Sequence, residues 1–229
     1  MVPDELMHSL RPVTVVVGHY GVGKTNFCIN LAIDAAEAGL DVTLIDLDIV
    51  NPYFRASEQR TVLEQHGVRL VAPVFAEAGS SLDVPSLTGG IAPAIEAAGE
   101  GQLVLIDAGG DDVGATALGR FARYVKAHDY AMLYVANRFR NLVADPRDAL
   151  ENMREIEAAS HLQVTALASN AHLKQLTTPE TVIEGLEYAQ ELSQLSGLRV
   201  VCVTAPQNVQ ITELDKLYPV HGYVKSPWE

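Results

Sequence analysis

The sequence contains only two cysteines, Cys28 and Cys202, which lie far apart along its 229 residues. We expect both to be buried core thiols in a reducing, cytoplasmic compartment, because disulfides form in oxidising ones. The sequence also lacks any apolar run near the ~18 residues that a membrane span requires. Its N-terminus, MVPDELMHSLRP, does not have the basic-then-apolar order of a secretory signal peptide.

Basic residues are scarce as well. The chain carries 16 lysines and arginines against 29 aspartates and glutamates, which gives a formal net charge of −13 at pH 7. The lysines and arginines form no run. Such a charge opposes nonspecific binding to DNA or to anionic lipid, so we expect no nucleic-acid partner and no stable membrane attachment. The excess of acid indicates a well-solvated surface.

No low-complexity linker and no internal repeat divides the chain, and 48% of its residues are hydrophobic. A chain of this length suits one domain, which buries roughly 70–75% of its unfolded surface. We therefore predict a single domain over residues 1–229. Residues 1–11 would be an N-terminal extension of this domain, and residues 205–229 a C-terminal segment that wraps around it.

Short apolar runs alternate with amphipathic stretches along the chain. The runs that predict strands are Val13–Val17, Val42–Asp46, Val68–Val71, Leu103–Asp107, Ala131–Ala136, Val164–Ser169 and Arg199–Thr204. Most are apolar throughout, as in strands that helices cover on both faces. The pairs Asp145-Pro146 and Thr178-Pro179 are typical helix starts. The buried face of one further helix is indicated by Leu118, Phe121, Ala122 and Val125.

This alternation predicts the fold class. Strands separated by helices favour right-handed crossovers, and therefore an α/β fold with a doubly wound, mostly parallel sheet. We expect about seven strands, with helices on both faces of the sheet.

Residues Gly18–Thr25, which read GHYGVGKT, fit the pattern G-x-x-x-x-G-K-[ST] of a phosphate-binding loop. A predicted strand leads into them and a predicted helix, Asn26–Ala38, follows. The chemistry needs that order, because successive backbone N–H groups and a helix N-terminus must face an anion. In such a loop Lys24 reaches the β- and γ-phosphates, and the Thr25 hydroxyl can bind Mg²⁺. The sequence therefore predicts nucleoside triphosphate binding.

Carboxylates follow two of the predicted strands. Asp46 and Asp48 alternate with Leu47 at the end of the second strand, so both project to the same side. Asp107 follows four apolar residues in the fourth strand, where an acid commonly holds Mg²⁺ directly or through water. Ligands of open α/β sheets bind at this carboxyl edge. We expect Asp48 and Asp107 to complete the site, whereas Asp46 could equally end a strand or cap a turn.

The residues after Asp107 have expected roles too. Gly109 and Gly110 provide a flexible backbone that could approach a γ-phosphate. Asp111 and Asp112 are expected to cap the next helix, whose positive end favours acidic residues.

With these motifs, the chain resembles the MinD/ParA group of P-loop ATPases, within the CobQ/CobB/MinD/ParA family. The phosphate loop of that group typically reads K-G-G-x-G-K-T, and the matching stretch here is His19–Thr25. The D-x-D pair at Asp46 to Asp48 and the D-x-x-G at Asp107–Gly110 also match. So do Asn170 and Pro206, which end the sixth and seventh predicted strands. The resemblance covers nearly the whole chain.

The resemblance implies ATP or ADP with Mg²⁺ as cofactors, and it implies roles for individual residues. Asp48 would orient or activate the attacking water, and Lys24, Asp48 and Asp107 would form the catalytic set. Residues implied to bind the nucleotide are Gly21, Val22, Gly23, Lys24, Thr25, Asn26, Asn170 and Pro206, the last two against the adenine base. Thr25, Asp48 and Asp107 would hold the metal. The absence of an N-K-x-D motif favours adenine over guanine.

The chain departs from the group at one important position. The group's extra lysine, which reaches across a dimer to the partner's nucleotide, is replaced by His19, and Tyr20 replaces a glycine. Histidine has an unperturbed pKa near ~6.5, so it cannot act as a constant cation. Either dimer-dependent activation is weakened, or another residue supplies the charge. The candidates are Arg55, Arg138 and Arg140, each of which could equally be a surface arginine.

The resemblance leaves the client of the ATPase open. The C-terminus YPVHGYVKSPWE is not the basic amphipathic helix of membrane-bound relatives, and the net charge disfavours the DNA-segregating version. Two isolated cysteines cannot form the paired-cysteine site of metal-insertion relatives within one chain. We therefore expect an ATP-hydrolysing switch that acts on a protein partner, foremost in metalloenzyme or cofactor maturation. We also expect a homodimer, whose assembly the nucleotide could control.

Two other functions stay open. One is an ATP-dependent small-molecule ligase or kinase, as in the dethiobiotin and cobyrinate synthetases. It requires an acceptor pocket, for which Asn51, Tyr53, Arg55 and the loop Phe75–Leu87 are candidates. The other is a nucleotide sensor that does not hydrolyse, in which His19 marks lost activation.

Overall fold

The computed structural model describes residues 2–48, 56–72, 89–211 and 214–224. Within them, strands of one sheet follow the order β3-β2-β4-β1-β5-β6-β7-β8, and every neighbouring pair is parallel. The strands are β1 (Val13–Val17), β2 (Asp41–Leu47), β3 (Arg69–Val71), β4 (Gln102–Ala108), β5 (Tyr130–Ala136), β6 (Ala166–Ser169), β7 (Val200–Pro206) and β8 (Leu217–Val220). The prediction of a parallel, doubly wound α/β sheet is confirmed.

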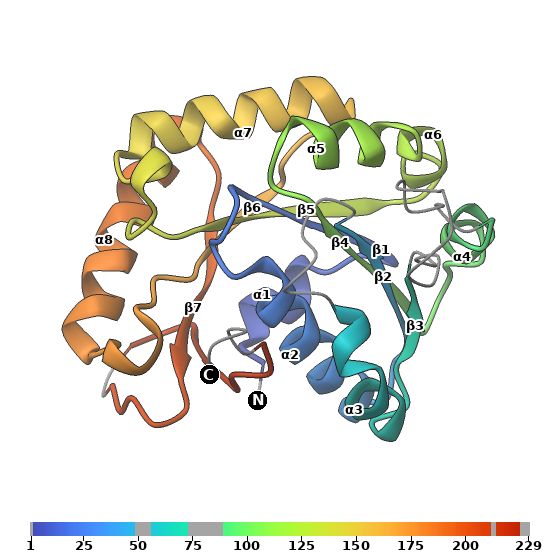
Figure 1. Ribbon diagram of the computed structural model, residues 1–229, viewed down its shortest axis with the longest axis horizontal. Coiled ribbons are helices and arrows are strands. Elements are labelled where there is room, and N and C mark those ends of the chain that lie inside the picture. Colours follow the sequence, from blue (N-terminus) through green and yellow to red (C-terminus); the bar gives the residue numbers. More distant parts are fainter. Residues whose placement is uncertain (1, 49–55, 73–88, 212–213, 225–229) are drawn as a thin grey trace, which may run out of the picture.

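Helices cover both faces of the sheet (Figure 1). They are α1 (Asp4–Ser9), α2 (Lys24–Glu37), α3 (Arg60–Gln65), α4 (Ile91–Glu96), α5 (Asp112–Gly119), α6 (Ala122–Val125), α7 (Pro146–Ser160) and α8 (Pro179–Ser196), with short 3₁₀ turns η1 (Ala56–Gln59), η2 (Asn141–Val143) and η3 (Lys174–Leu176). In Figure 1, α1, α2 and α3 lie below the sheet, and α5, α6 and α7 lie above it. No helix in the described ranges is long and apolar enough to span a membrane.

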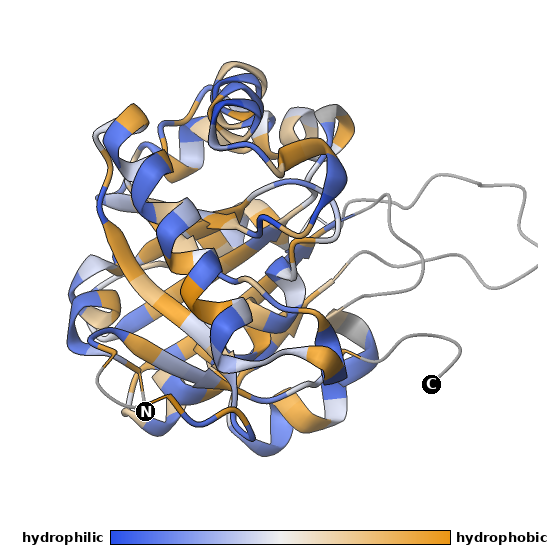
Figure 2. Ribbon diagram, turned by 90° about the vertical axis from the view of Figure 1, so that its left-hand side faces the viewer, coloured by the Kyte–Doolittle hydropathy of each residue, from blue (hydrophilic) through white to orange (hydrophobic). Residues whose placement is uncertain are grey.

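The strands are apolar because both of their faces are buried. All five residues of β1 are buried, and β2, β4 and β5 are buried at every position after the first. Figure 2 shows the same pattern, with largely hydrophobic strands inside and hydrophilic residues on the outer helices. Cys28 and Cys202 are buried free thiols, as expected. The continuous apolar runs therefore predicted the layers correctly.

The predicted helix starts are confirmed. Asp145 caps α7 by accepting a hydrogen bond from the Arg147 N–H, and Pro146 is the first helical residue. Thr178 caps α8 and forms a capping box with Thr181. Asp111 caps α5 by accepting a 2.8 Å hydrogen bond from the Gly114 N–H. These caps satisfy N–H groups that a helix start leaves unpaired.

Two elements differ from the sequence prediction. The apolar face from Leu118 to Val125 belongs to two short helices, α5 and α6, because the chain turns between Gly119, where α5 ends, and Ala122, where α6 begins. A Cβ on Gly119 would lie 2.7 Å from the Ala159 carbonyl oxygen of α7. The segment predicted only to wrap the domain contains the edge strand β8. Pro219 is tolerated there because an edge strand leaves one side of its backbone unpaired.

The topology fixes where a ligand can bind. β1 lies between β4 and β5, so the chain's crossovers run to opposite sides of it. In open parallel sheets ligands bind at the carboxyl edge beside such a switch point. The end of β1 and the loop that follows it are therefore the expected location of a site.

A close helix–strand contact gives the first testable prediction. A Cβ on Gly185 of α8 would lie 2.0 Å from the Ala171 Cβ after β6. We expect Gly185→Ala to lower the free energy of unfolding by about 1–3 kcal/mol, because this packed contact has no room for a methyl group. Urea denaturation measures the change.

Gly99→Ala is the matched control, because its Cβ would meet no atom closer than 3.9 Å. We expect this control to stay within about 0.5 kcal/mol of the wild type. A Gly185→Ala protein as stable as the control would contradict the close packing of α8 on this edge of the sheet.

Candidate functional site

The phosphate-loop sequence forms a turn between β1 and α2. β1 ends at Val17 and α2 begins at Lys24, so residues 18–23 make the connection. Gly21 has φ 75° and Gly23, which precedes α2, has φ 94°. Side chains other than glycine rarely adopt this left-handed backbone. The first N–H groups of α2 consequently open onto the turn, where an anion can accept from them.

The turn is closely surrounded by backbone from neighbouring strands. A Cβ on Gly18 would lie 2.4 Å from the Val135 carbonyl oxygen of β5. A Cβ on Gly110, which follows β4, would lie 2.5 Å from the Gly18 oxygen and 2.6 Å from Lys24 Nζ. Glycine at these positions therefore lets β4, β5 and the turn approach each other. The result is a cradle lined by backbone, as a polyphosphate requires.

Lys24 lies inside this cradle. Its side chain is buried, and Nζ donates a 3.2 Å hydrogen bond to the carbonyl oxygen of His19. Burial lowers the pKa of Lys24, and the nearby carboxylates of Asp107 and Asp48 oppose that shift. The ammonium thus lies between the turn and the ends of β2 and β4.

Asp46 and Asp107 are register partners on the adjacent strands β2 and β4. Both are buried, as is Asp48, whose N–H donates a 3.1 Å hydrogen bond to Asp46 Oδ1. This bond gives Asp46 the turn-forming role that the sequence left open. Asp48 Oδ1 lies 3.5 Å from the position of a Cβ on Gly109, so the ends of β2 and β4 meet.

Asp107 has the least satisfied side chain of this group. Both carboxyl oxygens are buried and have no hydrogen-bond partner among the residues that the structure describes. Burial and the nearby Asp46 raise the pKa of Asp107 to about 8, although Lys24 and the Thr25 hydroxyl act to lower it. Thr25 and Cys28 lie beside the carboxyl without a hydrogen bond of regular geometry.

These residues fit a Mg²⁺ ion that arrives with a polyphosphate. Within the described ranges no cluster of three or more His, Cys, Asp and Glu side chains could hold a metal by itself. Mg²⁺ needs no such cluster, because it is commonly bound by one or two carboxylates, waters and substrate phosphates. The Thr25 hydroxyl and the buried oxygens of Asp107 are ligands of the right chemistry at the right edge of the sheet.

Asn170 contacts the phosphate loop directly. Its Nδ2 donates a 2.7 Å hydrogen bond to the Val22 carbonyl oxygen, and its Oδ1 accepts one from the Thr204 hydroxyl. A Cβ on Gly23 would lie 2.4 Å from Nδ2. Asn170 therefore joins the ends of β6 and β7 to the loop, and its second Nδ2 hydrogen has no acceptor in the described part of the chain.

Pro206 and Asn26 occupy different surroundings. Pro206 ends β7, the neighbour of β6, and is half-buried. The Asn26 side chain turns away from the loop: Nδ2 donates to the His221 carbonyl oxygen at 2.9 Å, and Oδ1 accepts from the Tyr223 N–H at 2.8 Å. The structure thus places Lys24, Asp107 and Asn170 around the phosphate loop, whereas Pro206 only ends a neighbouring strand. The Asn26 side chain binds the C-terminal segment instead.

The structure also shows His19 and Tyr20, which replace a lysine and a glycine of the MinD/ParA phosphate loop. His19 is half-buried and its Nδ1 lies 3.1 Å from the Tyr20 carbonyl oxygen. The Tyr20 side chain is exposed. Asn51, Tyr53, Arg55 and residues 75–87, the candidates for an acceptor pocket, lie outside the described residues.

Sequence reasoning missed His172, which follows β6. Its Nε2 would lie 3.0 Å from a Cβ on Gly23, beside the phosphate loop. Burial, together with the positive charges of Arg140 and Lys174, lowers the pKa of His172 to about 4. The ring is therefore neutral at pH 7. In the sequence it was one of seven scattered histidines, and no spacing marked it.

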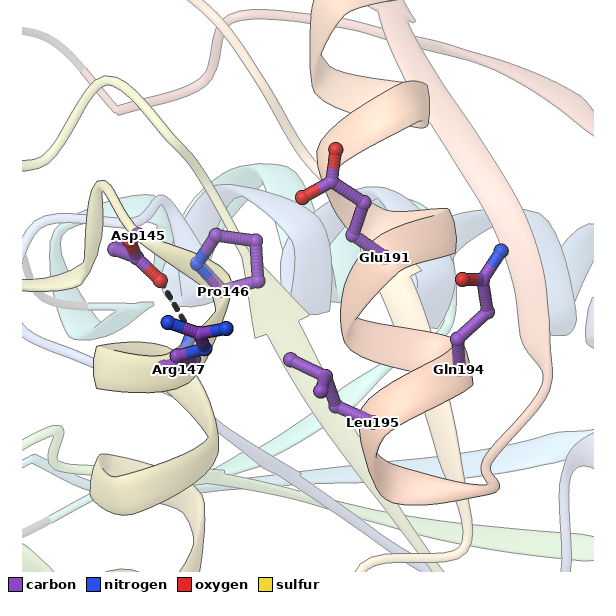
Figure 3. A pocket seen from close by; sticks show the side chains of 6 residues that line it. All are labelled: Asp145, Pro146, Arg147, Glu191, Gln194 and Leu195. Atoms are coloured by element: carbon purple, nitrogen blue, oxygen red, sulfur yellow. Dashed lines mark hydrogen bonds between the residues drawn. The ribbon is translucent and has the colours of Figure 1, made fainter.

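A separate cavity lies away from this edge. Its volume is about 420 Å³, and it opens between the start of α7 and the C-terminal half of α8 (Figure 3). It is lined by Asp145, Pro146, Arg147, Glu191, Gln194 and Leu195. Asp145 there caps α7 and the lining is mainly of surface side chains, so the cavity shows none of the chemistry of the phosphate loop.

Comparison with protein families supports a nucleotide-binding domain. The model of the CobQ/CobB/MinD/ParA nucleotide binding domain matches residues 13–178, more than half of the chain. That range contains the phosphate loop, Asp48, Asp107 and Asn170. No curated protein matches the sequence.

Solved structures share the fold at low identity. The signal recognition particle receptor FtsY from Elizabethkingia anophelis, in complex with GDP, is 23% identical with a TM-score of 0.52; the match covers 82% of this chain and 55% of that one. Chloroplast FtsY from Physcomitrella patens is 18% identical, with a TM-score of 0.55 and coverages of 82% and 56%. Signal Recognition Particle 54 kDa protein from Aeropyrum pernix, in complex with GDP, is 16% identical, with a TM-score of 0.53 and coverages of 82% and 40%.

At these identities the likeness shows a shared fold. The matched region is about half the length of those chains or less.

The raised pKa of Asp107 gives a stability prediction for protein without nucleotide or metal. The pKa of Asp107 in the folded protein, about 8, lies above the ordinary value of an aspartate, 3.8, so protonated Asp107 stabilises the folded state and this contribution is lost as the pH rises toward 8. The side chain at position 107 of the variant Asp107→Asn cannot ionise, so the variant does not lose this contribution. We expect its melting temperature to exceed that of the wild type by about 2–4 °C at pH 8.5, and by less at pH 6.

Differential scanning fluorimetry at the two pH values measures this difference. Asp41→Asn is the control, because Asp41 is exposed at the opposite end of β2. Its difference from the wild type should be the same at both pH values. A pH-independent effect of Asp107→Asn would show that the Asp107 carboxyl does not change its charge in this range.

Proposed function

The chain belongs to the CobQ/CobB/MinD/ParA nucleotide-binding domain family, and from that membership we propose that it is a Mg²⁺-dependent ATP-binding and hydrolysing switch that acts on a protein partner. The observation that carries the proposal is the buried Lys24 ammonium between a glycine-lined turn and two strand-end carboxylates. Such an arrangement suits a polyphosphate bound with a divalent cation.

In this proposal the loop and Lys24 bind the phosphates. The first N–H groups of α2 donate to phosphate oxygens, and Lys24 Nζ exchanges the His19 carbonyl oxygen for oxygens of the β- and γ-phosphates. Because Lys24 is already buried, its charge acts with little screening by water. Gly21, Val22 and Gly23 supply the backbone that encloses the phosphates.

Mg²⁺ would be held by Thr25 and Asp107, with Asp48 as a further ligand directly or through water, and when bound it neutralises charge that develops on the β- and γ-phosphates. The orphaned oxygens of Asp107 are the observation that favours this assignment. Asp48, at the end of β2, would orient the attacking water and accept its proton. Hydrolysis then forms the new oxygen–phosphorus bond as the bond between the β- and γ-phosphates breaks.

The adenine base would lie toward β6 and β7. Asn170 has one Nδ2 hydrogen beyond its bond to Val22, and Pro206 ends the neighbouring strand. The lack of an N-K-x-D motif supports adenine over guanine. Two of the similar structures are complexes with GDP, so we propose that binding of ATP and GTP be compared directly.

Exposed apolar side chains in the segments that follow three central strands favour a protein partner or a second subunit on this face. Tyr20, Val113 and Leu142 are exposed, and they follow β1, β4 and β5. Exposed apolar side chains near a site commonly mark a surface that another protein covers. We propose that a client protein or a homodimer contact covers these three side chains. A role in metalloenzyme or cofactor maturation stays a prediction, as do the ligase or kinase and sensor alternatives.

Lys24→Ala tests the ATPase proposal. We expect this variant to bind Mg²⁺–ATP at least about 100-fold more weakly than the wild type and to lose turnover, because the charge that faces the phosphates is gone. Isothermal titration calorimetry measures binding, and release of inorganic phosphate measures turnover. Lys126→Ala, in which an exposed lysine after α6 is removed, should behave as the wild type.

Equal turnover in the wild type and Lys24→Ala would rule out hydrolysis at this site. Tight binding of ATP by the wild type without turnover would favour the sensor. ADP release that requires an added small-molecule acceptor would favour the ligase or kinase.

Base selectivity is a separate prediction. We expect wild-type protein to bind ATP more than about tenfold more tightly than GTP in the same titration, which corresponds to about 1.4 kcal/mol. Equal affinities, or a preference for GTP, would contradict the adenine assignment and leave the phosphate site intact.

A further inference from the structure

Arg140 lies in the tight turn that follows β5. Within this turn the Arg140 N–H donates a 3.3 Å hydrogen bond to the Asn137 carbonyl oxygen, and the Arg140 carbonyl oxygen accepts a 3.0 Å bond from the Val143 N–H. The Asn137 side chain is buried, and its Oδ1 accepts a 3.1 Å bond from the Phe139 N–H. The backbone that carries Arg140 is therefore held in place by local hydrogen bonds.

The Arg140 side chain lies against the phosphate loop at Gly21. A Cβ on Gly21 would lie 3.7 Å from Arg140 Nε and 3.8 Å from Arg140 Cδ, which is ordinary van der Waals contact. Gly21 is one of the left-handed loop glycines. The guanidinium end of the side chain therefore lies beside the part of the loop that precedes Lys24.

The Arg140 Nε–H has no acceptor among the described residues, although it is buried. Burial lowers the pKa of Arg140, and no carboxylate contributes to that shift. Buried charged donors are almost always paired, because leaving one unpaired destabilises the folded protein. An unpaired buried donor beside a phosphate loop therefore indicates a partner that arrives from outside the chain.

Two neighbouring basic groups differ from Arg140. Arg138, two residues earlier, forms a 3.5 Å ion pair with Glu184 and packs over the Phe139 ring. His172 is also beside the loop, but its lowered pKa, about 4, leaves it neutral at pH 7. Arg140 thus differs from both, because it is a permanent cation beside the loop and its Nε–H has no acceptor among the described residues.

We infer that Arg140 is a phosphate ligand that, together with Lys24, binds the nucleotide's polyphosphate from within the same chain. The inference rests on the proposed function, because it assigns a residue to the same phosphate site. Phosphate oxygens satisfy the buried Nε–H, and a guanidinium donates to them through more than one N–H. Arg140 then supplies the positive charge that is lost where His19 replaces the lysine of the MinD/ParA group, and no second subunit is needed to supply it.

Arg140→Gln and Arg140→Lys test the inference, with Arg138→Gln as the matched control from the same turn. Binding of Mg²⁺–ATP and of Mg²⁺–tripolyphosphate, which has no base or ribose, is measured by calorimetry. We expect Arg140→Gln to weaken both ligands by about tenfold or more. Arg140→Lys should lie between Arg140→Gln and the wild type, and Arg138→Gln should stay within about threefold of the wild type.

The melting temperature without ligand separates phosphate binding from a role in packing. Arg140 is half-buried and its buried Nε–H is unpaired, so its removal in Arg140→Gln should leave the melting temperature unchanged or raise it. A lower melting temperature with unchanged ligand affinity would overturn the inference, as would a loss of ATP affinity with full affinity for tripolyphosphate.

These experiments distinguish failure of the Arg140 inference from failure of the proposed ATPase function. If the wild type binds no nucleotide, the proposed function fails and this inference with it. If the wild type binds ATP, Lys24→Ala does not, and Arg140→Gln binds as the wild type does, only the role of Arg140 is wrong.

Discussion

Several charged side chains are buried close together at the carboxyl edge of an apolar sheet, and the rest of the structure depends on this constraint. Lys24 is buried beside Asp48 and Asp107, and Asp107 faces Asp46 across two adjacent strands. Burial raises the pKa of Asp107, and the repulsion between carboxylates so close to one another raises it further. A bound cation relieves this repulsion, and a bound anion completes the surroundings of Lys24. The site is therefore arranged for two ligands of opposite charge.

The sheet makes this arrangement possible. Because β1 lies between β4 and β5, a loop after β1 is surrounded by the ends of strands from both halves of the chain. Glycines at positions 18 and 110 allow these segments to touch through their backbones. On the other side, Asn170 ties the end of β6 to the Val22 carbonyl oxygen. The loop is thus braced from several strands before any ligand is present.

The helix behind the loop is braced from the C-terminal segment. Asn26 and Asn30 both donate to the His221 carbonyl oxygen, and Asn30 Oδ1 accepts from the His221 N–H at 2.7 Å. Phe27 packs edge-to-face on Tyr218 of β8, with ring centroids 6.1 Å apart. Sequence reasoning could not find these contacts, because they join residues nearly 200 positions apart and no local pattern marks them. For the same reason β8 and the contact between Arg140 and Gly21 were missed.

Features that depend on local chemistry were predictable. The apolar runs located seven strands, the caps at Asp145 and Thr178 located the starts of α7 and α8, and the phosphate-loop pattern located the turn before α2. The roles of Lys24, Asp48 and Asp107 remain to be measured. The most direct measurement is calorimetric titration of ATP into folded wild-type protein, with Mg²⁺ and with EDTA. We expect saturable one-site binding that is lost or strongly weakened in EDTA. Absence of any binding, or binding unaffected by removal of Mg²⁺, would contradict a site built for a polyphosphate and its cation.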